Sequence, residues 1–144
     1  MAGIKTNVTE RYSNGQVIIS EGVVSAKAYV ILSGKVRISK RSGDRAITIA
    51  ILKEGDTFGE MGLFQEAVRS ATASAVGETA VGVINKDDFN KMVEDCPETL
   101  RYIINLLINK LRLTTNSLAS IGMQLEKAKK ALDAVSNKDA KING

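Results

Sequence analysis

The stretch Gly55–Thr72 reads Gly-Asp-Thr-Phe-Gly-Glu-Met-Gly-Leu-Phe-Gln-Glu-Ala-Val-Arg-Ser-Ala-Thr and is the most informative segment of the chain. Its three glycines let the backbone turn and bring main-chain N–H groups close to a ligand. Its one arginine, Arg69, carries a planar fork of donors that suits a phosphate. Its Glu60, once ionised, can only accept hydrogen bonds and needs a donor such as a sugar hydroxyl. The stretch therefore predicts a binding site for a compact sugar phosphate.

This stretch resembles the phosphate-binding cassette of the cyclic nucleotide-binding domain family. The family pattern is Gly-Asp/Glu-x-Phe-Gly-Glu, an apolar turn, and then Arg-(Ala/Ser/Thr)-Ala-Thr, and the chain matches it at residues 55–60 and 69–72. Many family members have proline just before the arginine, where this chain has Val68. The resemblance covers about residues 12–115. It implies a β-roll that binds cyclic AMP or cyclic GMP and needs no other cofactor and no metal.

The resemblance also implies roles for single residues. Glu60 falls where the family carboxylate accepts from the ribose 2′-hydroxyl, and Arg69 falls where the family arginine holds the phosphate. Small residues after Arg69 leave room for the ligand, and the Ser70 hydroxyl can help hold the phosphate or meet a guanine amino group. The candidate ligand-binding residues in the cassette are Phe58, Gly59, Glu60, Met61, Gly62, Leu63, Arg69, Ser70 and Ala71.

Within this set, main-chain N–H groups and the apolar turn are expected from Gly59, Met61, Gly62 and Leu63. Phe58 is expected to pack rather than to stack on the base. The alternative is that Arg69 is a surface arginine in an ion pair and Glu60 a solvated carboxylate.

Composition limits the other functions open to the chain. Its 144 residues, 44% apolar and 25% charged, are typical of one soluble globular domain. The net charge of +4 is too small to indicate nucleic acid binding by itself. The chain has no His and one Cys, so neither a zinc site nor a Ser-His or Cys-His nucleophile pair can be built. It lacks the apolar core of a signal peptide and any apolar run of membrane-spanning length, so a cytoplasmic protein without a membrane partner is expected.

Short apolar runs rich in Val, Ile and Thr alternate with glycine-containing turns up to residue 85. This pattern predicts a closed or rolled β architecture rather than an α/β sheet. Together with the family resemblance it implies a mostly β fold with some α, a jelly-roll-like β-roll. The expected strands are 16–20, 28–32, 36–39, 46–52, 72–76 and 80–84. Residues 1–14 are expected to form a short helix or arm, and residues 86–93 a short hinge helix. The β-roll with its cassette and hinge helix is therefore assigned to residues 1–96.

Residues 97–144 are expected to form a long C-terminal helix, with Pro97 in its first position and fraying from Ser136 onward. Apolar residues recur at steps of four and three over five heptads; one of the two sets is Ile104, Leu111, Leu118, Leu125 and Leu132. Such a stripe could simply cover the β-roll, but about 60 Å of helix is longer than a small domain is wide. A parallel coiled-coil homodimer is therefore predicted. The flanking positions carry few charge pairs and leave the choice of partner open.

Residues 97–120 resemble the C helix of the bacterial catabolite activator protein branch. There a Leu-x-Val-Thr-Ser segment reaches the adenine, and the matching segment here begins at Leu111 and contains Thr114 and Thr115. The resemblance implies that both threonines contact the base; a threonine hydroxyl can donate and accept. Thr114 could instead be a tolerated polar residue in the seam. The activator proteins carry a DNA-binding helix-turn-helix after this helix, and the chain ends before one could fit, so no direct contact with nucleic acid is expected.

These observations predict a cyclic nucleotide sensor, with cyclic AMP favoured over cyclic GMP. Ligand binding would rearrange the C-terminal helix, and a downstream effector that is not identified would read the change. Alternatives are a regulatory fragment of a larger transcription factor, kinase or channel, a degenerate domain that only holds a dimer together, and a nucleotide-processing enzyme. The enzyme would use Asp56, Glu60 and Arg69, but the chain has no further nucleophile or metal cluster placed to help them.

Overall fold

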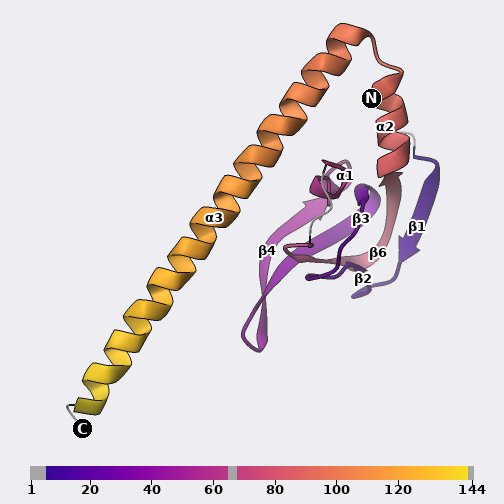
Figure 1. Cartoon of the computed structure of the whole chain (residues 1–144). Coiled ribbons are helices and arrows are strands. Elements are labelled where there is room, and N and C mark those ends of the chain that lie inside the picture. Colours follow the sequence, from indigo (N-terminus) through magenta and orange to yellow (C-terminus); the bar gives the residue numbers. More distant parts are fainter. Residues whose placement is uncertain (1–5, 65–67, 143–144) are drawn as a thin grey trace. The chain divides into compact units, whose positions relative to one another are not determined.

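The computed structural model describes residues 6–64 and 68–142 (Figure 1). The elements of this part of the chain are β1 (Val8–Tyr12), β2 (Val17–Ile19), β3 (Lys27–Ser42), β4 (Arg45–Lys53), β5 (Thr57–Phe58), α1 (Met61–Phe64), β6 (Thr72–Asn85), α2 (Lys86–Glu94) and α3 (Glu98–Ile142). The chain divides between Arg101 and Tyr102 into two compact units, which are described separately.

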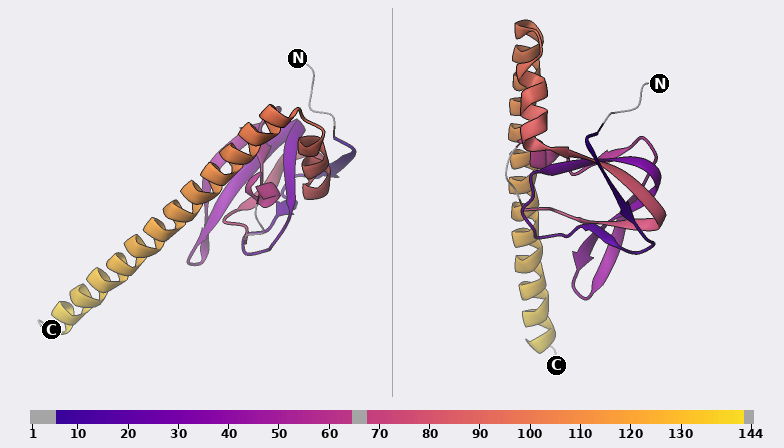
Figure 2. Two further views of the ribbon diagram at one scale, coloured as in Figure 1. Left: turned by 45° about the horizontal axis from the view of Figure 1, so that its top comes forward. Right: turned by 90° about the vertical axis from the view of Figure 1, so that its right-hand side faces the viewer.

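The first unit is a rolled antiparallel sheet in the order β1-β6-β3-β4, with β2 paired to β6 and β5 paired to β3 (Figure 2). The long strands β3 and β6 pair along most of their length, from Lys27↔Asn85 to Ser39↔Thr72. All of these strand pairs are antiparallel, and β3 and β4 are joined directly by a hairpin turn. The predicted fold class, a β-roll followed by a hinge helix and a long C-terminal helix, is confirmed.

The core of the roll lies between β3 and β6. Ile31, Val36 and Val81 are the largest side chains that are fully buried there. Tyr29 on β3 stacks on Phe58 on β5, with 5.2 Å between the ring centroids. This stack anchors the short β5 strand in the core and so holds the turn that follows it.

Gly34 and Gly77, which were expected to end strands, lie inside long strands and bend them instead. The runs 28–32 and 36–39 form one strand, β3, which shifts its register around Gly34, and the runs 72–76 and 80–84 form one strand, β6. Gly34 has φ +86°, and a Cβ there would lie 2.4 Å from the main-chain oxygen of Glu78. Thr79 lies beside this close approach and donates from Oγ1 to the main-chain oxygen of Lys35 at 3.0 Å. Glycine therefore lets the two strands approach through the bend without breaking the pairing.

The expectation of a helix or arm in residues 1–14 is wrong for the described part of that segment. Residues Val8–Tyr12 form β1, which pairs with β6 from Val8↔Val83 to Tyr12↔Thr79. A five-residue strand with one partly buried aromatic residue carries little local signal, and its partner lies about seventy residues away. The two-residue strand β5 was not expected either. The hinge helix is confirmed, as α2.

The second unit begins at Tyr102 and contains the rest of α3. The whole helix has 45 residues and is about 67 Å long. The main-chain oxygen of Pro97 accepts from the N–H of Arg101 at 2.9 Å, so Pro97 flanks the helix rather than occupying its first position. The helix continues through Ser136 to Ile142, and the predicted fraying is not seen in the described residues. Lys138, Ala140 and Lys141 are good helix formers, which explains the extension. Leu111, Leu118, Leu125 and Leu132 are between 49% and 71% exposed, and dimerisation through them stays a prediction.

Candidate functional site

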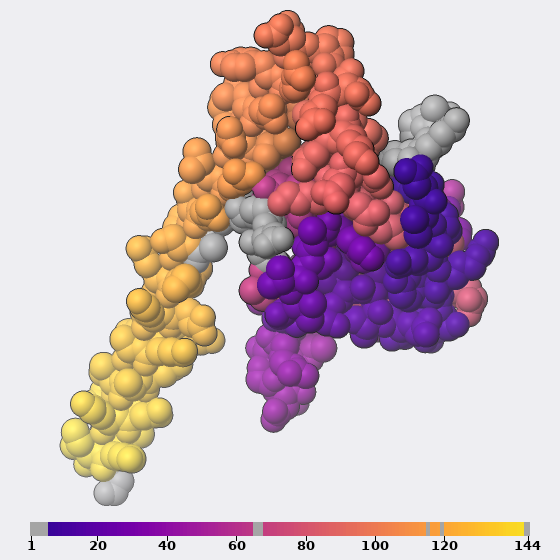
Figure 3. All heavy atoms as spheres, turned by 45° about the vertical axis from the view of Figure 1, so that its right-hand side comes forward, coloured from indigo at the N-terminus to yellow at the C-terminus, as the bar shows by residue number. Residues whose placement is uncertain are grey.

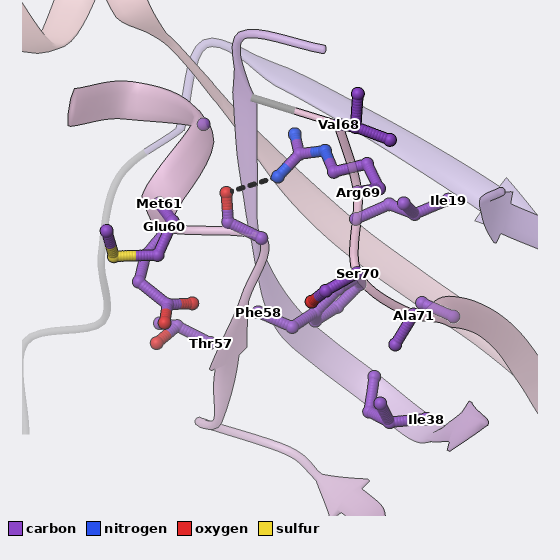
Figure 4. Close-up of a pocket in the computed structure, with 13 residues that line it drawn as sticks. Ile19, Ile38, Thr57, Phe58, Glu60, Met61, Val68, Arg69, Ser70 and Ala71 are labelled. Carbon is purple, nitrogen blue, oxygen red and sulfur yellow. Dashed lines mark hydrogen bonds between the residues drawn. The ribbon is translucent and has the colours of Figure 1, made fainter. Parts of the chain in front are cut away.

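A pocket of about 250 Å³ opens beside the turn between β5 and α1 (Figure 4). Figure 4 shows Glu60 and Thr57 on one side of it and Ser70, Ala71 and Ile38 on the other. The lining residues are Ile19, Ile38, Thr57, Phe58, Gly59, Glu60, Met61, Gly62, Val68, Arg69, Ser70, Ala71 and Ala73. The two ends of the stretch singled out in the sequence therefore face one cavity.

Arg69 lies in the wall of this pocket and is only 8% exposed. Its Nη1 donates to the main-chain oxygen of Gly59 at 2.7 Å, and its Nη2 donates to the main-chain oxygen of Lys27. Its Nε is buried and finds no acceptor among the described residues. No ion pair joins it to a carboxylate in the described part of the chain. Arg69 is thus a buried cation held by neutral oxygens, with donor capacity left over.

Burial lowers the pKa of Arg69 below its usual value, because the charged guanidinium loses solvation. Tyr29 and Glu60 act in the opposite direction, since negative charge near the guanidinium favours its protonated form. Glu60 itself is exposed and lines the pocket. A bound anion would offset the desolvation of Arg69 more directly than the solvated Glu60 can.

Two glycines make the room that the guanidinium occupies. A Cβ on Gly62 would lie 2.7 Å from Nη2 of Arg69 and 2.7 Å from the main-chain oxygen of Ser25. A Cβ on Gly59 would lie 3.1 Å from Nη1, and this residue has φ +74°. The glycines therefore serve the placement of Arg69 as well as the turn.

The turn itself uses two of the N–H groups that were expected to face a ligand. Gly62 donates to the main-chain oxygen of Gly59 at 3.1 Å, and Leu63 donates to that of Glu60 at 3.0 Å. Leu63 is 6% exposed and is not among the pocket-lining residues. In this structure these two N–H groups close the first turn of α1, and Leu63 packs into the roll.

The other predicted cassette residues all line the pocket: Phe58, Gly59, Glu60, Met61, Gly62, Arg69, Ser70 and Ala71. Thr114 lies in the second unit, exposed on α3, where its Oγ1 donates to the main-chain oxygen of Lys110 at 2.8 Å. The side chain of Thr115 lies outside the described residues.

Five lining residues were not predicted: Ile19, Ile38, Thr57, Val68 and Ala73. Thr57 and Val68 belong to the quoted stretch and adjoin predicted residues, so their positions were a usable signal. Ile19 and Ile38 come from β2 and β3, and only strand pairing brings them to the cassette.

Residues 6–64 and 68–142 contain no group of three or more His, Cys, Asp or Glu side chains that could hold a metal ion. None of the helices described in this range is long and apolar enough to cross a membrane.

Residues 9–96 match the family model of the cyclic nucleotide-binding domain. The chain belongs to this family. This confirms the resemblance that the cassette residues indicated. The ligand class of the family is cyclic nucleotides. The match covers the roll, the pocket and α2.

Among curated proteins, the domain is 30% identical over 111 residues to the CRP-like cAMP-activated global transcriptional regulator of Mycobacterium tuberculosis, covering 76% of this chain and 50% of the regulator. It is 32% identical over 126 residues to the human cGMP-dependent protein kinase 2, covering 85% of this chain and 16% of the kinase. The chain thus spans half or less of these relatives.

Among solved structures, the half-site-occupied form of the EAL enzyme Bd1971 has a TM-score of 0.71 and 28% identity, covering 75% of this chain and 97% of that chain. The catabolite activator protein of Thermus thermophilus has a TM-score of 0.61 and 30% identity, covering 80% of this chain and 55% of that chain. Cyclic nucleotide-binding domains of this kind therefore occur in proteins with different outputs.

Proposed function

We propose that this domain is a non-enzymatic sensor that binds cyclic AMP more tightly than cyclic GMP in the Arg69 pocket. The observation that carries the proposal is the buried Arg69 guanidinium, which has neutral oxygens as partners and no carboxylate in an ion pair among the described residues. A cyclic phosphate supplies the missing negative charge and accepts from the donors that remain.

The ribose is proposed to lie between Arg69 and Glu60. The main-chain oxygen of Gly59 accepts a hydrogen bond from the Arg69 guanidinium. Glu60, the proposed acceptor for a ribose hydroxyl, is the next residue in the chain and is therefore held close to Arg69. The carboxylate is exposed at the pocket wall and can accept a hydroxyl without first leaving a buried partner.

The base preference is proposed from the Thr114 hydroxyl. Its proton is donated to the main-chain oxygen of Lys110, so the oxygen keeps its lone pairs and acts as an acceptor. Adenine presents an amino donor where guanine presents a carbonyl acceptor. A threonine hydroxyl that accepts a hydrogen bond therefore favours adenine. Thr115 is proposed as the second contact with the base in the liganded state.

Coupling to the C-terminal helix is proposed to pass through two aromatic rings of the first unit. Phe64 in α1 meets Phe89 in α2 edge to face, with 5.7 Å between the centroids. Arg101, at the start of α3, donates from Nη1 to the main-chain oxygen of Glu94, the last residue of α2, at 3.3 Å. A ligand that shifts α1 would thus shift α2 and the origin of α3, because each step is a direct contact.

The output remains open between a stand-alone sensor and the regulatory part of a longer transcription factor, kinase or channel. Isothermal titration of the chain with cyclic AMP and with cyclic GMP tests the sensor, and chromatography of the nucleotide after incubation tests for turnover. We expect binding of both, tighter for cyclic AMP, and recovery of intact ligand. Absence of binding would refute the sensor, and a hydrolysed nucleotide would refute its non-enzymatic nature.

A further inference from the structure

The β3–β4 hairpin projects from the roll (Figures 1 and 3). Its sequence is strongly cationic. Between residues 35 and 53 the chain has six cations and one acid, Asp44, although the whole chain carries a net charge of only +4. The six cations, all exposed, are Lys35, Arg37, Lys40, Arg41, Arg45 and Lys53. The hairpin is therefore the main concentration of positive charge on the first unit.

Three isoleucines lie exposed among these cations. Ile47, Ile49 and Ile51 on β4 are 55%, 58% and 50% exposed, and none belongs to the core cluster. Ile47 pairs with Lys40 across the hairpin. A shallow depression at the tip is lined by Lys40, Arg41, Ser42, Ile47 and Ile49, so charge and aliphatic surface meet in one place.

Nucleic acid and a second copy of the chain fit this surface less well. Residues 35–53 contain no aromatic side chain on which a base could stack, and the isoleucines would contribute nothing to phosphate contacts. The apolar stripe of a partner's α3 would bring more positive charge, because residues 99–125 contain three cations and no acid. The exposed cations and isoleucines of the hairpin fit a partner that is both anionic and apolar.

We propose that the tip of the β3–β4 hairpin docks on an anionic lipid surface. Lys40, Arg45, Ile47 and Ile49 share one face of the hairpin, because Lys40 pairs with Ile47 and Ser42 with Arg45. Lys40 and Arg45 meet the phosphates of the headgroups, while Ile47 and Ile49 enter the boundary between headgroups and acyl chains. The projection of the hairpin lets it reach a flat surface ahead of the rest of the roll (Figure 3). The sequence-based expectation of no membrane partner rested on the lack of a spanning segment, which peripheral docking does not require.

The test is flotation of the full chain with vesicles of equal parts phosphatidylserine and phosphatidylcholine, compared with vesicles of phosphatidylcholine alone. We expect binding to the first kind and not the second, weakening as salt is raised. Lys40→Gln with Arg45→Gln should lower the partition coefficient about 25-fold. Ile47→Ser with Ile49→Ser should lower it about tenfold.

Matched controls separate this docking from general charge and from misfolding. Lys127→Gln with Lys129→Gln removes the same charge from α3, and Val8→Ser removes an exposed aliphatic side chain from β1; both should bind vesicles like the wild type. Titration with cyclic AMP should be unchanged in the hairpin variants, since none of the substituted residues lines the nucleotide pocket.

Three outcomes would overturn the proposal. The first is a vesicle assay in which the wild type does not bind, or in which either hairpin double variant binds as strongly as the wild type. The second is binding of an oligonucleotide duplex that needs Lys40 and Arg45 but not the isoleucines, with no vesicle binding. The third is a sedimenting mass of the Ile47→Ser, Ile49→Ser variant below that of the wild type. That result would assign the surface to contact with a second copy of the chain.

Discussion

Nη1 of Arg69 donates to the main-chain oxygen of Gly59 at 2.7 Å, across ten positions of sequence. This bond joins the two ends of the cassette, because the residue after Gly59 is Glu60, the proposed ribose acceptor. The proposed phosphate and ribose contacts are therefore placed by one interaction, and a change at either end should be felt at the other.

Arg69→Ala should weaken binding of both cyclic nucleotides by about 2–5 kcal/mol, since a charged and largely desolvated partner is lost. That corresponds to about 30- to 4,000-fold in affinity, measured by isothermal titration. Arg11→Ala, which removes an exposed arginine from β1, is the control and should bind normally. Retention of affinity within about threefold would contradict the phosphate role.

Gly62→Ala should weaken nucleotide binding by about 1–3 kcal/mol, the usual effect of overpacking. The new Cβ would lie 2.7 Å from both Nη2 of Arg69 and the main-chain oxygen of Ser25, so the guanidinium must move. Gly122→Ala is a matched control on α3, where a Cβ meets nothing within 4 Å. That control should stabilise the helix by about 1 kcal/mol and leave affinity unchanged. Equal affinities for the two variants would show that Gly62 does not position Arg69.

Glu60→Gln should weaken cyclic AMP binding by about 1–2 kcal/mol, the difference between a charged and a neutral acceptor. The informative comparison uses 2′-deoxy cyclic AMP, which lacks the hydroxyl that Glu60 is proposed to accept. The wild type should bind the deoxy ligand poorly, and the substitution should then have little further effect. If the wild type binds both ligands equally, Glu60 is not the ribose contact.

Thr114→Leu should act in two directions. A leucine in the seam adds apolar surface to the predicted dimer, at about 0.8 kcal/mol per buried CH₂, and should raise the sedimenting mass at a given concentration. Cyclic AMP binding should weaken by about 1–2 kcal/mol, and cyclic GMP binding by less, because the accepting hydroxyl is lost. A strictly monomeric protein would refute the dimer, and unchanged cyclic AMP affinity would refute the base contact.

Gly34→Ala should lower the free energy of unfolding by about 2–5 kcal/mol, combining backbone strain with a steric clash. Its Cβ would lie 2.4 Å from the main-chain oxygen of Glu78. Gly43→Ala, at φ +62° with no atom within 4 Å of its Cβ, should suffer only the strain, about 1–2 kcal/mol. Urea unfolding of the two variants checks the difference, and equal losses would mean that the close approach at Gly34 is relaxed at no cost.

The resemblance of residues 55–72 to a family pattern was enough to predict the cassette, and local patterning was enough to predict a rolled β architecture and the long helix. Glu60 and Arg69 lie nine residues apart within one turn-rich stretch, and the Leu and Ile repeat of α3 follows from helical periodicity alone. Most of the pocket wall comes from the same stretch, because its two ends, around Gly59 and Arg69, meet at the pocket.

Contacts between distant segments could be known only from the folded chain. The pairing of β1 with β6, the arrival of Ile19 and Ile38 at the pocket, and the Lys27 oxygen on Arg69 each depend on strand register. Register depends on packing across the whole sheet, which no local pattern encodes. The same reason explains why Gly34 bends β3 instead of ending it: its neighbour across the sheet, Glu78, lies 44 residues further along the chain.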